Sequence, residues 1–318
     1  MKKILIVDGL NLFMRHYAAH PAMNSNGEQV GGIVGFFYAI LDKVEKFKPR
    51  QTIIVWEAGG SKRKRDLFGD YKKKSRPQRL NRYYDDDLPD TIQNRNFQIK
   101  MLISLFQSLP VDQIYVEDCE ADDVIGYLCN YKLKNEIKLI ISSDHDYYQL
   151  IDEKTRVWSP TLKKLVDTNK VIERFKIHPN NFCLAKCIAG DPSDNIKGAP
   201  GVGFKNLVKY FPKFGEEQEY AMDEFFEDTG IKQQEKDLKA FRSILDNEAV
   251  IRRNWRLVLL DMQNLSQKID SIIDNNNEKI DKMEMMRLIL KNGIQNLNID
   301  RAFLTFKLNK NKNHGDNK

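Results

Sequence analysis

Acidic side chains that could bind divalent cations recur in five short stretches of this sequence. In chain order, the stretches contain Asp8; Glu57; Glu120, Asp122 and Asp123; Asp144 and Asp146; and Asp191 and Asp194. Residues two apart in an extended segment point the same way, so Asp144 and Asp146 can share one target. Asp191 and Asp194 are three apart and can share one face of a helical turn. These spacings allow several carboxylates to converge.

A divalent metal is the chemistry that such a convergence favours. Taken alone, each group has a simpler explanation, because acids stabilise helix N-termini and also occur in turns and caps. Converging carboxylates repel one another, however, and at close range they cannot all stay ionised without a cation. Mg²⁺ prefers carboxylates, water and phosphate oxygens. Two such ions about 4 Å apart can activate a water and stabilise the leaving oxygen in phosphodiester cleavage.

Short buried strands are expected to position three of these acids. Each of three β-branched runs is followed within three residues by one acid of the set. The runs are 3–7, 52–56 and 137–141, and the acids are Asp8, Glu57 and Asp144. In parallel sheets, ligands bind outside the carboxyl ends of the strands. The sequence therefore predicts that these acids meet at one edge of a sheet.

Helices are expected between the strands, which indicates a mostly parallel sheet covered on both faces. A further strand is predicted at 113–116. Helices are predicted at 10–19, 32–47, 91–109 and 121–133. From about residue 182 the strand pattern fades, and the rest of the chain is expected to be mostly helical.

The positive charge of the chain is concentrated in one segment. The chain has 318 residues, 41% of them hydrophobic, and a net charge of +6. Residues 61–82 contain ten Lys or Arg against two Asp, so this segment carries +8 and the rest of the chain −2. Such a concentration favours a polyanionic partner. With few apolar residues to dock it on a core, the segment is expected to order only when nucleic acid binds.

Other classes of protein fit the composition less well. No apolar stretch approaches the roughly 20 residues of a membrane span, so we expect a soluble, cytoplasmic protein without a membrane partner. The cysteines are too few for a disulfide scaffold, and their spacing is not that of zinc ligands. We therefore expect buried, reduced thiols. They are Cys119, Cys129, Cys183 and Cys187.

Motifs in a fixed order give the sequence a resemblance to a known family. They are DGLNLFMR at 8–15, GGIVGF at 31–36, YK at 71–72, EADDVIG at 120–126, SSDHDYYQL at 142–150, GDPSDNI at 190–196 and GAPGVGFK at 198–205. The chain resembles the flap endonuclease and 5′→3′ exonuclease family, particularly its bacterial and bacteriophage members, over roughly residues 1–215. The family usually has Asp where this chain has Glu57.

The resemblance implies an α/β fold of the PIN or 5′ nuclease type, with a mostly parallel twisted sheet flanked by helices. It implies a nuclease core at 1–180, including a basic helical arch at about 58–96. A helical region containing a helix-hairpin-helix element is expected at 181–306, followed by a flexible tail at 307–318.

The resemblance also implies roles for individual residues. The metal ligands would be Asp8, Glu57, Glu120, Asp122, Asp123, Asp144, Asp146, Asp191 and Asp194, holding two Mg²⁺ ions that Mn²⁺ can replace. Lys72 and Arg76 would stabilise charge on the scissile phosphate. Nucleic acid would contact Arg15, Lys72, Lys73, Arg76, Tyr83, Gly201, Gly203 and Lys205, with a K⁺ ion at the helix-hairpin-helix.

The function that follows is a structure-selective 5′ nuclease, acting in primer removal, replication or repair and leaving a 5′-phosphate and a 3′-hydroxyl. Its partner would be DNA with 5′ flaps or ends, or an RNA–DNA hybrid, and the protein would be a monomer. Two alternatives stay open. One is a non-catalytic branched-DNA-binding protein, supported by Glu57. The other is a phosphatase using Asp144 and Asp146, although Tyr148 stands where that class has Thr or Val.

Overall fold

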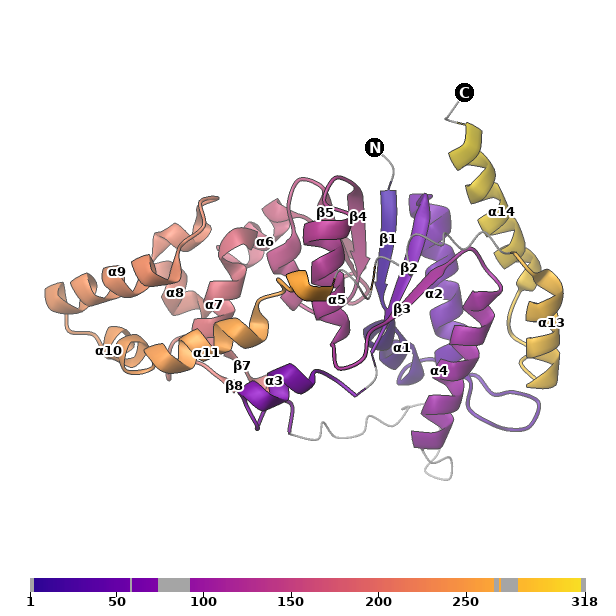
Figure 1. The fold of residues 1–318 in the computed structure, drawn as a ribbon, viewed down its shortest axis with the longest axis horizontal. Helices are drawn as coiled ribbons and strands as arrows, with labels where there is room; N and C mark the ends of the chain where they lie inside the picture. Colours follow the sequence, from indigo (N-terminus) through magenta and orange to yellow (C-terminus); the bar gives the residue numbers. More distant parts are fainter. Residues whose placement is uncertain (1–2, 58, 74–91, 266–268, 270–279, 316–318) are drawn as a thin grey trace.

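A six-stranded sheet forms the centre of this computed structural model, which describes residues 3–57, 59–73, 92–265, 269 and 280–315. The strands are β1 (Lys3–Asp8), β2 (Gln51–Trp56), β3 (Asp112–Tyr115), β4 (Ile137–Ile141), β5 (Thr155–Ser159) and β6 (Lys164–Val166). Their order is β3-β2-β1-β4-β5-β6. β1 to β5 run parallel, and β6 runs antiparallel to β5. The predicted mostly parallel sheet is confirmed (Figure 1).

Alternate residues of the central strands pack in two cores, one on each face of the sheet. In β1, Ile4 and Ile6 belong to one core, while Leu5 and Val7 belong to the other. All four are at most 2% exposed. Because both faces are buried, these strands are continuous apolar runs rather than alternating ones.

Helices cover both faces of the sheet. The core of Leu5 and Val7 is shared by α1 (Gly9–Tyr17), α2 (Gly31–Phe47) and α4 (Ile92–Gln107). The opposite core is shared by α5 (Ala121–Tyr127), its π-helical continuation Leu128–Lys132, and α6 (Thr168–Phe175).

A helical region extends from one side of the sheet (Figure 1). It contains α7 (Phe182–Ala189), α8 (Phe204–Tyr210), α9 (Met222–Glu235), α10 (Lys239–Asp246) and α11 (Glu248–Val258). Two-residue strands, β7 (Gly190–Asp191) and β8 (Ile196–Lys197), join α7 to α8. The predicted helical region after residue 181 is thus present, with this small hairpin inside it.

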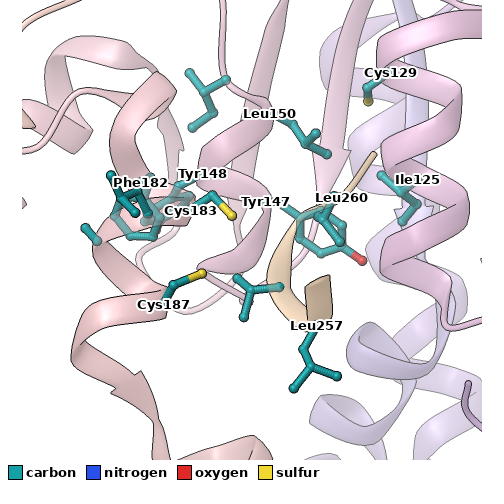
Figure 2. Packing of buried hydrophobic residues seen from close by; sticks show 14 of the residues in the cluster. Ile125, Cys129, Tyr147, Tyr148, Leu150, Phe182, Cys183, Cys187, Leu257 and Leu260 are labelled. Atoms are coloured by element: carbon teal, nitrogen blue, oxygen red, sulfur yellow. The ribbon is translucent and has the colours of Figure 1, made fainter. Parts of the chain in front are cut away.

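Dense packing fixes the junction between the sheet and the helical region. Figure 2 shows Tyr147 and Tyr148 lying between α7, which carries Cys183 and Cys187, and the helix that carries Ile125. Both tyrosines belong to the 3₁₀ helix η2 (Asp146–Leu150) and are at most 2% exposed. The cysteines are all free and buried, as predicted.

The last two helices return to the α/β core. α13 (Lys282–Lys291) and α14 (Ile299–Gly315) share a core with α2 and α4. Arg301 of α14 forms ion pairs with Asp42, at 2.6 Å, and Glu45, at 2.7 Å, of α2. The segment expected to be a flexible tail, 307–318, is helical as far as Gly315. The domain boundaries at 180 and 306 stay a prediction. No helix in the described ranges is long and apolar enough to cross a membrane.

Candidate metal and nucleic-acid site

Three acids lie at the carboxyl edge of three adjacent parallel strands. Asp8 is the last residue of β1, Glu57 directly follows β2, and Asp144 lies three residues after β4. β1 is hydrogen-bonded to β2 on one side and to β4 on the other. The strands therefore bring these acids to one edge of the sheet, as their sequence positions indicated.

Asp8 is buried among hydrogen-bond donors. Its carboxylate accepts hydrogen bonds from the hydroxyls of Tyr147, at 2.9 Å, and Ser142, at 3.1 Å. It also caps α1 by accepting a hydrogen bond from the Asn11 N–H, at 3.2 Å. Burial raises the pKa of Asp8 to about 7, even though these hydrogen bonds lower it. Such a carboxyl gains from a nearby cation more than an exposed one does.

The first acidic cluster is at the start of α5. Carboxylate oxygens of Glu120, Asp122 and Asp123 lie within 4.8 Å of one another. A lysine that sequence reasoning did not assign to this site is inserted among them. The ammonium of Lys64, on α3 (Lys62–Leu67), lies 2.9 Å from Glu120, 3.1 Å from Asp123 and 3.4 Å from Asp122. Burial alone would lower the pKa of Lys64, but the three carboxylates raise it.

Glu120 is the most heavily contacted acid of this cluster. Tyr71 donates its hydroxyl to the same oxygen that Lys64 contacts, at 2.7 Å, and Lys72 contacts the other oxygen, at 2.7 Å. Burial raises the pKa of Glu120, but the two lysines outweigh it and lower this pKa to about 2. Glu120 therefore stays ionised over the physiological pH range.

The second acidic cluster combines Asp146 of η2 with Asp191 and Asp194. Their carboxylate oxygens also lie within 4.8 Å of one another. The ammonium of Lys186, on α7, contacts Asp146 and lies 2.8 Å from Asp191. Burial raises the pKa of Asp191, but Lys186 lowers it to about 2.

Lys72 joins the two clusters. Its ammonium lies 2.7 Å from Glu120 of the first cluster and 3.8 Å from Asp194 of the second. Its backbone N–H donates to the Asp194 carbonyl at 3.0 Å. Both clusters therefore lie within reach of one cation, and a phosphate placed there could meet both of them.

The donor set of the two clusters fits hard divalent cations. The donors are carboxylate oxygens, which Mg²⁺ and Mn²⁺ prefer and which do not favour zinc. Both carboxylate oxygens of Asp123 and one of Asp146 are buried without a hydrogen bond from any described residue. The ammonium groups of Lys64 and Lys186 lie against these oxygens, so the protein already supplies part of the positive charge that buried carboxylates need.

The residues expected to contact nucleic acid lie on three separate elements. Arg15 is exposed at the end of α1 and donates to the Thr161 hydroxyl at 2.9 Å. Gly201, with a φ of +76°, and Gly203, which precedes α8, lie in the loop of the α7–α8 hairpin. Lys205 is exposed on the first turn of α8.

The basic segment docks on the core over part of its length. Lys64 is 1% exposed and Tyr71 is 4% exposed. Asn195 donates to the Asp70 carbonyl at 2.8 Å. Residues 61–73 therefore dock on the core more extensively than their few apolar residues indicated, and the expectation that the segment orders only on binding nucleic acid stays a prediction. Arg76 and Tyr83 lie outside the described residues, whereas Lys73 is exposed and pairs with Asp70 at 2.9 Å.

The family model described as 5'-3' exonuclease, N-terminal resolvase-like domain, matches residues 3–176. The chain belongs to the 5′-3′ exonuclease family. A 5′-3′ exonuclease of Aquifex aeolicus is 26% identical over 297 residues, which cover 86% of this chain and 96% of the relative. A 5′-3′ exonuclease of Buchnera aphidicola is 30% identical over 217 residues, covering 67% and 71%. The expected enzyme class, a nuclease, is confirmed. The phosphatase alternative is therefore excluded.

Two further matches show how this family member relates to longer chains and to known folds. DNA polymerase I of Bacillus subtilis is 28% identical over 270 residues, and these cover 82% of this chain but 28% of the polymerase. The structure of the T5 D15 protein co-crystallised with metal ions matches with a TM-score of 0.64 and 19% identity, covering 90% of this chain and 99% of that one. The structural match shows the shared fold.

Sequence reasoning missed two buried lysines of the site, Lys64 and Lys186. For Lys64 the signal was weak, because α3 ends at Leu67 and few apolar residues mark its buried side. Leu67, Phe68 and Tyr71, three to seven residues further on, pack on the core. Lys186 lies on the otherwise apolar helix α7, where a lysine with 7% exposure needs a buried acid.

Proposed function

We propose that this protein is a divalent-metal-dependent, structure-selective 5′ nuclease that cleaves phosphodiester bonds near 5′ ends or branches. The observation that carries the proposal is the pair of all-carboxylate clusters that Lys72 joins at the carboxyl edge of the sheet. Curated relatives named 5′-3′ exonuclease and flap endonuclease Xni support the same activity. The roles that follow are removal of primers or flaps in replication and repair.

In this proposal, two Mg²⁺ ions, replaceable by Mn²⁺, are held by the two clusters. Asp144 would assist the metal ligands of the second cluster. Asp8 and Glu57, at the ends of β1 and β2, would lie next to the metal ligands. The ions supply an activated water and positive charge at the leaving oxygen. Lys72 moves from Glu120 to the scissile phosphate and stabilises its negative charge, and Arg76 assists it.

The substrate in this proposal is held at three places. The hairpin loop with Gly201, Gly203 and Lys205 contacts the duplex backbone without reading sequence, with a K⁺ ion in its loop. Arg15 contacts a phosphate next to the site. The basic segment, through Lys73, Arg76 and Tyr83, holds the unpaired 5′ strand of DNA or of an RNA–DNA hybrid. The protein acts as a monomer, in the cytoplasm of a bacterial or phage-infected cell.

Cleavage of an end-labelled 5′-flap duplex, with Mg²⁺ or with EDTA, tests this function. We expect cleavage near the branch only with Mg²⁺. Asp146→Asn should lower the single-turnover rate about 10²-fold or more while sparing flap binding, because it removes one charge-stabilising carboxylate. Glu153→Gln is a matched control, since Glu153 is exposed on the turn before β5, at the opposite end of the sheet. Flap binding without cleavage in Mg²⁺ would instead support the non-catalytic alternative.

A further inference from the structure

We propose that Asp123 is the permanent counter-ion of Lys64 rather than a metal ligand, and that this pair is the buried floor on which Glu120 and Asp122 are held. The inference rests on the proposed metal site. It assigns a positioning role to Lys64 and removes Asp123 from the set of ligands that the sequence motif suggested.

The depth of the side chains separates the floor from the open side of the cluster. The side chains of Lys64 and Asp123 are 1% and 0% exposed, whereas those of Asp122 and Lys72 are 18% and 38% exposed. The Glu120 side chain is also 1% exposed, but its second oxygen contacts the more exposed Lys72, so an ion that enters from solvent meets Asp122 first and reaches Glu120 from the side of Lys72. Asp123 lies beneath them.

Asp123 is surrounded by cations of α3. Its carboxylate lies 3.1 Å from the Lys64 ammonium and 3.7 Å from the Arg63 guanidinium. Neither of its oxygens accepts a hydrogen bond with good geometry from any described residue. The charge of Asp123 is thus compensated from within the protein, by the buried Lys64 and by Arg63, whose side chain is 44% exposed.

Lys64 cannot leave this position without undocking its helix. Ser61 caps α3 by accepting a hydrogen bond from the Lys64 N–H at 3.2 Å, and Arg63 donates to the Arg256 carbonyl at 3.2 Å. Phe68, directly after the helix, packs under the guanidinium of Arg253, 4.0 Å from its ring centre. The Lys72 side chain is 38% exposed and is held by ion pairs with Glu120 and Asp194, so its ammonium can turn away from the cluster while its backbone stays in place.

The floor also balances the charge of the site. Three carboxylates carry a formal charge of −3, and the buried Lys64 ammonium leaves −2. In the ion-free protein the more exposed Arg63 and Lys72 offset this remainder, and a divalent ion would take over the share of Lys72. Without Lys64, the same cluster would hold an uncompensated buried carboxylate even when an ion is bound, which is costly.

Mn²⁺ binding by electron paramagnetic resonance, together with thermal unfolding in EDTA, tests the pair. Asp122→Asn should raise the Kd for Mn²⁺ at least about tenfold, which corresponds to about 1.4 kcal/mol. The charge-neutral double variant Lys64→Met/Asp123→Asn should bind Mn²⁺ within about threefold of wild type. In EDTA, Lys64→Met alone should lower the melting temperature by at least about 5 °C, and adding Asp123→Asn should restore most of that loss.

A pair on the same helix serves as the control. Lys62 and Asp66 form an exposed ion pair at 2.6 Å, and Lys62→Met/Asp66→Asn should change neither the Mn²⁺ Kd nor the melting temperature. A double floor variant that binds Mn²⁺ as weakly as Asp122→Asn would show that Asp123 is a ligand and would overturn the inference. Wild-type protein that binds no Mn²⁺ would overturn the proposed metal site itself.

Amine labelling of the wild-type protein decides the case in which the floor variants do not fold. Reductive methylation, read by peptide mass spectrometry, should leave Lys64 protected both in EDTA and in Mn²⁺. Lys72 should become more reactive in Mn²⁺, because the ion takes its carboxylate partner. Labelling of Lys64 that rises on Mn²⁺ addition would show that the ion displaces it, and the pair would then not be permanent.

Discussion

Replacing Lys72 by methionine separates two possible roles of this side chain. One is to bind the 5′ strand, and the other is to stabilise negative charge on the scissile phosphate. Methionine keeps much of the apolar stem and removes the charge. In the free protein the ammonium lies between Glu120 and Asp194. If its place in the reaction is the scissile phosphate, the change should act on the rate far more than on binding.

The structure sets the size of each effect. The Lys72 side chain is 38% exposed, and its buried partner Glu120 keeps the Lys64 ammonium at 2.9 Å, so losing the Lys72 ion pairs should cost about 1 kcal/mol of folding free energy. One lost phosphate contact should weaken flap binding less than about tenfold at moderate salt. Loss of one preorganised charge at the reacting phosphate, by contrast, commonly lowers the rate about 10²- to 10³-fold.

Single-turnover cleavage of a labelled 5′ flap in Mg²⁺ measures the rate, and fluorescence anisotropy in Ca²⁺ measures affinity. Lys73→Met is the matched control, because Lys73 is the next residue, its side chain is 68% exposed, and it pairs with Asp70 outside both clusters. We expect Lys73→Met to change affinity and rate by similar small factors. If Lys72→Met does the same, the lysine is a tether and the reasoning from its bridging position fails.

Two further predictions concern pH and duplex binding. Because burial raises the pKa of Asp8 to about 7, folded protein keeps a proton between about pH 4 and 7 that unfolded protein releases. Without metal, the free energy of unfolding should therefore fall as pH rises through this range. Asp8→Asn should flatten the decrease in melting temperature measured in EDTA from pH 5 to 8. If the pH dependence of the melting temperature is unchanged in this variant, the raised pKa does not belong to Asp8. Lys205→Ala should weaken duplex binding for all sequences. It should also reduce the dependence of log affinity on log salt concentration by about one phosphate contact. If that salt dependence is unchanged, Lys205 does not contact the DNA backbone.

Elements marked by local sequence signals were predictable. β4 lies at 137–141 as expected, and the strand-end positions of Asp8 and Glu57 follow from apolar runs that stop at an acid. β5 and β6 were not predicted, because these short strands mix polar and apolar residues and their stability depends on pairing with neighbouring strands rather than on a local apolar run. The return of α14 to α2 was missed for the same reason, since a contact between Arg301 and Glu45 leaves no local pattern.

Charge in the sequence identified the basic segment but not the direction in which each lysine points. Residues 62–65 are all Lys or Arg, and composition alone treats them alike. The fold separates them, because the Lys64 ammonium is buried against Glu120, which Tyr71 also contacts, while Lys62 is exposed. A segment that its composition assigned to a polyanion therefore has a second use, because Arg63, Lys64 and Lys72 all pair with the protein's own acids.

This division explains how so many carboxylates can coexist before any ion binds. Lys64 and Lys186 each belong to one cluster and are nearly inaccessible to solvent, so they offset part of the repulsion without blocking the open side. Lys72 is half-buried and spans both clusters, and its backbone is tied to Asp194 by a hydrogen bond of 3.0 Å. Ion binding would remove the partners of the Lys72 ammonium while leaving its backbone in place. The lysine would then be held at the site with its charge available, which is the condition that stabilising a scissile phosphate requires.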